Sequence, residues 1–209
     1  MDQAFDAVLG RYTQRMADER RIMAENPGQL GAIRDQLLLS VGEDAGRFLH
    51  ALAVARGAKR ILELGTSYGY STLFFADAAR QTGGRVVSMD VAAGKQDYAR
   101  RQLADAGLEG YVDFQAGDAL ELLDRSEGPF DFVLLDIWKN LYIPCFERFR
   151  TKLAPNAIIA ADNMLEPAGA RPDAERYRAE VRKHPEFQTM LLPIGQGIEL
   201  SCLWQDGVR

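Results

Sequence analysis

Oxygen-bearing side chains follow two short apolar runs in the second half of the sequence. Phe132–Leu135 is followed by Asp136, and Ile158–Ala161 is followed by Asp162 and Asn163. If the two runs are adjacent parallel strands, about 4.8 Å apart, the three side chains can converge on one ion. Two carboxylates and an amide oxygen form a hard ligand set that favours Mg²⁺ and also suits Mn²⁺ or Ca²⁺. The sequence therefore predicts a divalent-metal site at these two strand ends.

A metal at this point would activate a hydroxyl group. A divalent cation stabilises an oxyanion and lowers the pKa of a hydroxyl bound to it, and three protein ligands leave coordination positions for a bidentate substrate. Lys139 follows Asp136 by three residues and can take the proton if the cation lowers its pKa. Each of these residues also has a simpler interpretation: Asp136 can be a strand-end cap, Asp162-Asn163 a turn, and Lys139 a solvated lysine. The prediction of a metal site therefore depends on their combination.

A second group of candidates surrounds a glycine-containing turn after an earlier apolar run. That run carries Glu63, and Gly65 and Gly69 follow it, permitting a tight turn and a close backbone approach to a ligand. The spacing differs from the G-x-G-x-x-G that cradles a pyrophosphate, so a ligand with a sulfonium and an ammonium group suits this acidic turn better. The next run ends at Asp90, which can accept hydrogen bonds from ribose hydroxyls. In the alternative interpretation, Glu63 and Asp90 merely cap the following helices.

Strand and helix patterns alternate from residue 60 onward, which predicts an α/β fold with a parallel sheet buried on both faces. The expected strands lie at 60–64, 86–89, 112–115, 132–135 and 158–161, and the expected helices at 71–80, 94–106, 119–124, 140–152 and 172–184. Two further extended runs, 187–192 and 198–204, are joined by a short glycine-rich connection that allows only an antiparallel pair.

Two helical patterns, at 4–25 and 44–56, precede the first strand, and Asn26-Pro27-Gly28 is expected to end the first of them. We interpret residues 1–58 as a helical lid or dimer element and 59–209 as the α/β core of a single domain. The apolar side of the helix predicted at 4–25 would pack equally well on its own domain and on a second copy of the chain.

Composition excludes several classes of function. The formal net charge of −5 argues against nucleic acid as a partner. With no membrane-length apolar run and no signal-like N-terminus, we expect a cytoplasmic protein without a membrane partner. His50 and His184 are the only histidines, and Cys145 and Cys202 belong to no Cys-x-x-Cys unit, so a zinc site is not expected.

Several segments resemble the cation-dependent O-methyltransferases, the family that includes catechol and caffeoyl-CoA O-methyltransferases. These segments are ILELGTSYGYS at 61–71, the acid at 90 and GDAL at 117–120. The resemblance implies a Rossmann-like, seven-stranded class I methyltransferase sheet, mostly parallel with an antiparallel edge strand, and S-adenosylmethionine as the cofactor. The residues that it assigns to the cofactor pocket are Val41, Glu63, Gly65, Thr66, Ser71, Asp90, Ala119 and Asp136.

The resemblance extends to the predicted metal site. DIWKNLY at 136–142 is similar to the DHWK segment of catechol O-methyltransferases, and AADN at 160–163 is similar to their second metal segment. It implies that Asp136, Asp162 and Asn163 bind the metal and that Lys139 is the general base. Ile137 departs from the family pattern, because the catechol enzymes have His there and the plant enzymes have a further acid in this segment.

The resemblance also suggests residues for the methyl acceptor. Trp138 and Pro167 fall where the family has walls around an aromatic ring, and Glu199 matches a carboxylate that receives the second hydroxyl of the substrate. Plain packing is the alternative for Trp138 and Pro167, and a solvent-facing strand position is the alternative for Glu199. Pocket shape is expected to depend on residues 26–42, 167–172 and the loop at Gly195.

The leading hypothesis is methyl transfer to a hydroxyl of a small phenolic or catechol-like acceptor held on a divalent metal, in a homodimer like those of the family. Metal-independent methylation of another nucleophile is a second hypothesis. An NAD-dependent oxidoreductase is a third, although the missing G-x-G-x-x-G counts against it. A non-catalytic cofactor-binding module is the fourth.

Overall fold

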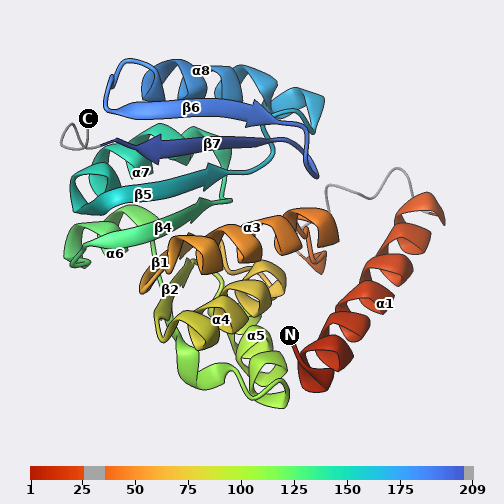
Figure 1. The fold of residues 1–209 in the computed structure, drawn as a ribbon. Coiled ribbons are helices and arrows are strands. Elements are labelled where there is room, and N and C mark those ends of the chain that lie inside the picture. Colours follow the sequence, from red (N-terminus) through yellow and green to blue (C-terminus); the bar gives the residue numbers. More distant parts are fainter. Residues whose placement is uncertain (26–35, 205–209) are drawn as a thin grey trace.

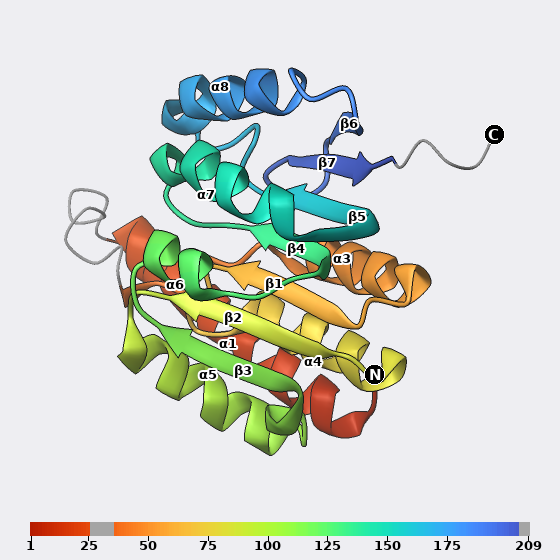
Figure 2. The same cartoon turned by 90° about the vertical axis from the view of Figure 1, so that its left-hand side faces the viewer.

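The computed structural model describes residues 1–25 and 36–204, and a seven-stranded sheet lies at its centre (Figures 1 and 2). The strand order is β3-β2-β1-β4-β5-β7-β6. β1 to β5 pair in parallel, whereas β7 runs antiparallel to both β5 and β6. The strands are β1 (Arg60–Leu64), β2 (Arg85–Asp90), β3 (Val112–Ala116), β4 (Phe130–Leu135), β5 (Leu153–Ala161), β6 (Phe187–Leu192) and β7 (Ile198–Leu203). The predicted mostly parallel sheet with an antiparallel edge is confirmed.

Helices cover both faces of this sheet and define two hydrophobic cores. One core lies under α1 (Gln3–Glu25), α3 (Glu43–Arg56), α4 (Tyr70–Thr82) and α5 (Ala93–Asp105). The other lies under α6 (Ala119–Arg125), α7 (Tyr142–Phe149) and α8 (Arg171–Val181). Since both faces are covered, the central strands are apolar along almost their whole length instead of alternating with polar residues.

Two predicted elements differ most from the structure, and the helix predicted over 172–184 ends three residues early, at Val181. The helix expected over 140–152 is divided into a short 3-10 turn at Lys139–Leu141, α7, and a second 3-10 turn at Arg150–Lys152. β5 begins at Leu153, five residues before the predicted start at Ile158. Its first half contains Pro155 and Asn156, which has a φ of +57°, and its register against β4 shifts between Phe130 and Phe132. An irregular strand of this kind lacks the apolar run by which a strand is recognised.

Helix α1 packs on its own chain. Its residues Phe5, Val8, Leu9 and Tyr12 are buried in the same core as α3 and α4. The predicted end of this helix at 26–28 lies outside the described residues. None of the described helices is both long and apolar enough to cross a membrane. The division at residue 58 and the homodimer stay predictions.

The parallel register aligns the carboxyl ends of β1, β2, β4 and β5, which the predicted site residues follow. Leu64 at the end of β1 pairs with Met89 of β2 and Leu135 of β4, and Leu135 pairs with Ala161 of β5. The residues that follow these positions therefore leave the sheet at the same edge, where ligands bind in open α/β folds.

Candidate active site

Asp136 and Asp162 lie at the carboxyl ends of adjacent strands, as predicted. The main-chain N–H of Asp136 donates to the carbonyl of Leu64 at 2.9 Å, and that of Asp162 donates to the carbonyl of Leu135 at 3.1 Å. These bonds continue the sheet ladder by one residue, so the two acids start from fixed backbone positions. Asn163 has a φ of +57° and turns the chain away from the sheet directly afterwards.

The carboxylate of Asp162 is buried without a partner. The residue is 1% exposed, and neither carboxylate oxygen has a hydrogen-bond donor among the described residues. Burial, and then the charge of Asp136, raise the pKa of Asp162 to about 8. Burial also raises the pKa of Asp136. A buried acid of this kind is costly unless a cation or a proton neutralises it.

Lys139 brings a positive charge to the acidic cluster, the name used below for Asp136, Asp162 and Asn163. Its Nζ donates to Asn163 Oδ1 at 2.8 Å and to the carbonyl of Ile137 at 3.3 Å, and it lies 4.0 Å from Asp136 Oδ1. Nζ also donates to the hydroxyl of Tyr142. The structure thus brings Lys139, Asp136 and Asn163 together, as the sequence predicted.

Tyr142 is a site residue that the sequence analysis missed. It is fully buried at the start of α7, and its hydroxyl donates to the main-chain carbonyl of Asp162 at 3.2 Å. Burial raises its pKa well above 10, so this hydroxyl keeps its proton. The Lys139-x-x-Tyr142 spacing, about one helical turn, was the available sequence signal.

Gln196 is a second missed residue. Its Oε1 accepts a hydrogen bond from Asn163 Nδ2 at 2.7 Å, which leaves Asn163 Oδ1 directed toward Lys139. Gln196 lies in the β6–β7 loop, and its carbonyl also accepts from the N–H of Leu165 at 2.9 Å. No local sequence pattern indicates a contact between residues 33 positions apart.

The glycine turn after β1 lies directly beside the acidic cluster. Gly65 has a φ of +106°, and a Cβ on it would meet the carbonyl oxygen of Asp136 at 2.0 Å. No residue with a side chain fits there without moving the backbone. The structure therefore joins the two predicted groups of site residues, because this turn packs on the backbone of a predicted metal ligand.

Glu63 is fully buried beneath that turn in a network of hydroxyl groups. Its carboxylate accepts hydrogen bonds from Ser71 and Thr72, each at 2.6 Å, and from Ser88. Thr66 joins the network through a 2.6 Å contact between its hydroxyl and that of Ser88. Burial raises the pKa of Glu63 to about 7 despite these donors. The network fixes the start of α4, which carries Ser71, relative to β1.

Asp90 organises the other side of the turn. Its Oδ2 accepts a hydrogen bond from the N–H of Ser67 at 2.7 Å, and its Oδ1 accepts from the N–H of Ala92 at 2.8 Å. Ala119 begins α6 behind Asp118, whose carboxylate caps that helix by accepting from two main-chain N–H groups. The structure places both residues at the same edge of the sheet as Gly65.

The substrate role expected for Glu199 does not fit its surroundings. Glu199 is fully buried on β7, where its carboxylate accepts from Arg178 at 2.7 Å, Arg182 at 2.9 Å and Thr189 at 2.7 Å. Both oxygens are occupied by these donors, and none of its described contacts is with the acidic cluster. We interpret Glu199 as the buried charge that fastens α8 to the sheet, since such a charge needs paired cations.

The remaining predicted residues lie in the segments around the acidic cluster. Trp138 follows Asp136 by two residues and is 53% exposed, and Pro167 follows a cis peptide bond four residues after Asn163. Val41 is buried, and a Cβ on Gly195 would meet its carbonyl at 2.9 Å. The loop at Gly195 and the segment before α3 therefore lie against each other, as expected for two parts of one pocket wall; residues 26–35 lie outside the described ones.

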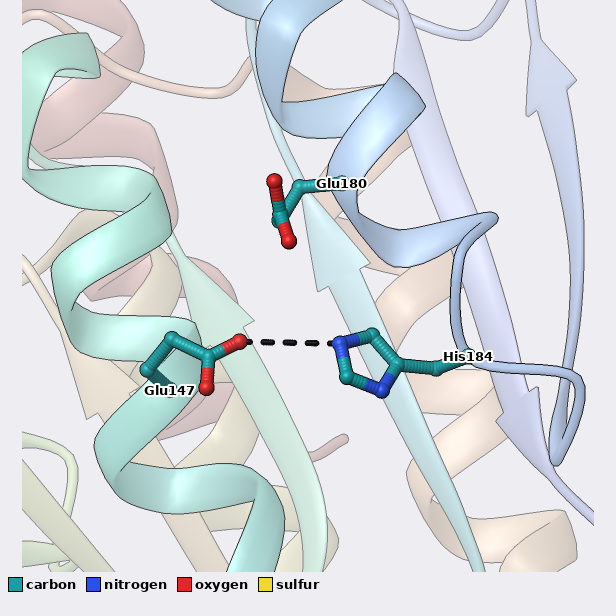
Figure 3. Close-up of side chains that lie close together, drawn as sticks. All are labelled: Glu147, Glu180 and His184. Atoms are coloured by element: carbon teal, nitrogen blue, oxygen red, sulfur yellow. Dashed lines mark ion pairs between the residues drawn. The ribbon is translucent and has the colours of Figure 1, made fainter.

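A second cluster of metal-type side chains lies between α7 and α8 (Figure 3). Donor atoms of Glu147, Glu180 and His184 lie within 4.8 Å of one another, and His184 Nε2 is 3.6 Å from Glu147 Oε1. Here each glutamate already has a cation, Arg150 at 2.9 Å for Glu147 and Lys183 at 2.7 Å for Glu180. We interpret it as an ion-pair network between two helices, in contrast to the unpartnered carboxylate of Asp162.

Comparisons with known proteins find similar sequences over most of the chain. A family model described as O-methyltransferase matches residues 15–203. A catechol O-methyltransferase of Niastella koreensis is 34% identical over 175 residues, covering 82% of this chain and 78% of that protein. Caffeoyl-CoA O-methyltransferase 1 of Zea mays is 28% identical, covering 93% of this chain and 80% of that protein.

A solved structure agrees with the fold. The O-methyltransferase TomG from Streptomyces achromogenes, determined in complex with SAM, superposes with a TM-score of 0.77 at 24% identity. The match covers 98% of this chain and 91% of that one. At this identity the likeness concerns the fold, which is that of class I methyltransferases.

Proposed function

We propose a reaction from one premise: the chain belongs to the O-methyltransferase family and is an S-adenosylmethionine-dependent O-methyltransferase of the caffeoyl-CoA and catechol type. The proposal is that the methyl group goes to one hydroxyl of a small phenolic acceptor with two neighbouring hydroxyls, held on a divalent metal ion. A cytoplasmic location and a homodimer remain predictions alongside it.

The observation that carries the metal part is the buried, unpartnered carboxylate of Asp162. Asp136 and Asn163 add two more oxygen donors next to it, and the set contains no nitrogen or sulfur donor. Such a set suits Mg²⁺, with Mn²⁺ or Ca²⁺ as alternatives. When bound, the ion would supply the positive charge that stabilises the acceptor oxyanion and lowers the pKa of its hydroxyl.

The chain's own groups orient the reaction around this point. Lys139 Nζ is held by Asn163 and the Tyr142 hydroxyl, and we assign it to take the proton of the acceptor hydroxyl. It can do so as a neutral amine, the form that the positive charge of a bound metal ion would favour. The hydroxyl of Tyr142 and the carbonyl of Ile137 fix Nζ at the cluster instead of letting the side chain extend into solvent. Trp138 and Pro167 are the side chains that we assign to the two sides of the aromatic ring.

The cofactor pocket that we propose is the edge formed by the β1–α4 turn and the end of β2. Gly65 and Thr66 give the backbone of the turn, and Asp90 offers its carboxylate to the ribose hydroxyls. Val41, Ser71, Ala119 and the buried Glu63 complete the proposed lining. The close packing of Gly65 on the backbone of Asp136 supports this pocket, because a methyl donor held at the turn would then lie beside an acceptor held at Asp136, as in-line transfer requires.

Methyl transfer from labelled S-adenosylmethionine to a panel of ortho-dihydroxy aromatics and their CoA thioesters, with and without a chelator, tests the proposal. We expect transfer to depend on added Mg²⁺, and matched monohydroxy aromatics to react far more slowly because they cannot chelate the ion. Transfer that continues unchanged in chelator would refute the metal part and favour metal-independent methylation. Transfer only to acceptors without neighbouring hydroxyls would refute the acceptor class.

A further inference from the structure

Helix α1 contacts the proposed cofactor turn through the hydroxyl of Tyr12. Tyr12 is fully buried, and its hydroxyl donates a 2.6 Å hydrogen bond to the main-chain carbonyl of Tyr68, in the middle of the turn. Burial raises the pKa of Tyr12 well above its usual value, so the hydroxyl stays protonated and remains a donor. This bond joins residues 56 positions apart and fixes a peptide group of the turn from outside the sheet.

Arg15, about one helical turn further along α1, holds the same residue from another direction. Its guanidinium carbon lies 3.7 Å from the centroid of the Tyr68 ring. Nε donates to Glu19 at 2.7 Å, and a terminal nitrogen donates to the carbonyl of Gln36 at 2.9 Å. The second oxygen of Glu19 accepts from the N–H of Leu38 at 2.9 Å. One face of α1 therefore holds both the turn and the segment that leads to Val41.

The turn needs this support because its backbone is unusual. Ser67 has a φ of +46°, a conformation that costs energy for a residue with a side chain. Gly69 has a φ of +88°, and a Cβ on it would lie 2.5 Å from that of Ala99 and 3.1 Å from the Tyr12 hydroxyl. The N–H of Ser67 is the donor to Asp90 described above. The position of the Asp90 carboxylate is thus linked through Ser67 and Tyr68 to α1.

We propose that Tyr12 and Arg15 are positioning residues for S-adenosylmethionine, and that α1 is a structural part of the cofactor site. They hold the turn in its binding conformation before the cofactor arrives, so that binding does not have to order it. The inference depends on the proposed cofactor pocket, and it is independent of the metal and of the acceptor.

The test measures the dissociation constant of S-adenosylhomocysteine by isothermal titration calorimetry on the full chain. Tyr12→Phe keeps the ring and removes the hydroxyl, and Arg15→Met keeps the stem and removes the cation. We expect each variant to weaken binding about three- to tenfold, which corresponds to the loss of one hydrogen bond or one cation–π contact. At saturating cofactor, kcat should stay unchanged while the KM for S-adenosylmethionine rises by the same factor.

Two further variants make the result decisive. Tyr177→Phe is the matched control, because Tyr177 is fully buried on the inner face of α8 and its hydroxyl has no hydrogen-bond partner among the described residues. The affinity of this variant should equal that of the parent chain. Asp90→Ala tests the pocket itself and should weaken binding most. A Tyr12→Phe protein that melts earlier yet binds with parental affinity, while Asp90→Ala binds weakly, would overturn the positioning role alone. Parental affinity in Asp90→Ala as well would overturn the proposed pocket and the inference with it.

Discussion

Replacing Asp162 with asparagine should have opposite effects on stability and on metal binding. In the metal-free protein the carboxyl group is buried with no donor to either oxygen, and its pKa is raised from 3.8 to about 8. Unfolding at pH 7 therefore releases a proton, because the unfolded carboxyl is ionised there. Each pH unit between 3.8 and 7 is worth about 1.4 kcal/mol, so this group lowers the free energy of unfolding by about 4 kcal/mol at pH 7.

The asparagine removes that contribution but leaves a buried amide with unmade hydrogen bonds, which cost about 1–3 kcal/mol. We expect Asp162→Asn without metal to be more stable than the parent chain by about 1–3 kcal/mol at pH 7. Below about pH 4 the carboxyl group is protonated in both the folded and the unfolded parent, so the parent has its full stability there. This stability is lost progressively as the pH rises to about 8, the pKa of the folded state. The advantage of the variant should therefore grow between these values.

A bound metal ion should offset this advantage. Mg²⁺ at about one hundred times its dissociation constant should stabilise the parent chain by about 2.7 kcal/mol and leave the variant unchanged. Urea unfolding of both proteins at pH 5 and pH 7.5, with chelator and with Mg²⁺, measures all of these quantities. Asp105→Asn is the control, because that side chain is 61% exposed and paired with Arg11. A variant that is less stable than the parent in chelator at pH 7.5, or that Mg²⁺ still stabilises, would refute the reasoning.

Three further substitutions test other parts of the site. Lys139→Met should reduce kcat at least about a hundredfold, because the proton acceptor is gone, while calorimetry shows Mg²⁺ affinity retained; equal kcat would remove Lys139 from the chemistry. Gln196→Leu should weaken Mg²⁺ binding about tenfold, because the Asn163 amide loses the 2.7 Å contact that orients it, and unchanged affinity in a titration would contradict that role. In the parent, the free energy of unfolding should fall by up to about 3 kcal/mol between pH 4.5 and 7, because the pKa of the buried Glu63 is raised to about 7 and its protonated form is lost as the pH rises. Glu63→Gln should abolish this fall. A urea-unfolding series in which the variant keeps the same pH dependence would assign the fall to another group.

The sequence by itself determined the order of strands and helices and the residues at the strand ends. Asp136, Asp162 and Asn163 were identifiable because they come within two residues of the end of an apolar run, and parallel strands bring such positions to one edge. Gly65 was identifiable because a turn from strand to helix at that position needs a residue without a side chain. These are properties of short segments and of the strand period, so they are readable without coordinates.

Only the tertiary structure decided which side chains complete the site. Gln196 reaches Asn163 from the β6–β7 loop, Tyr142 reaches the main-chain carbonyl of Asp162 from α7, and Tyr12 reaches the glycine turn from α1. The same is true of Glu199, whose matching position in the sequence suggested a substrate contact, whereas in the structure its carboxylate is paired with Arg178 and Arg182. A side chain's partners depend on how helices pack on the sheet, and that packing is set by shape and burial over the whole chain, which no local spacing records.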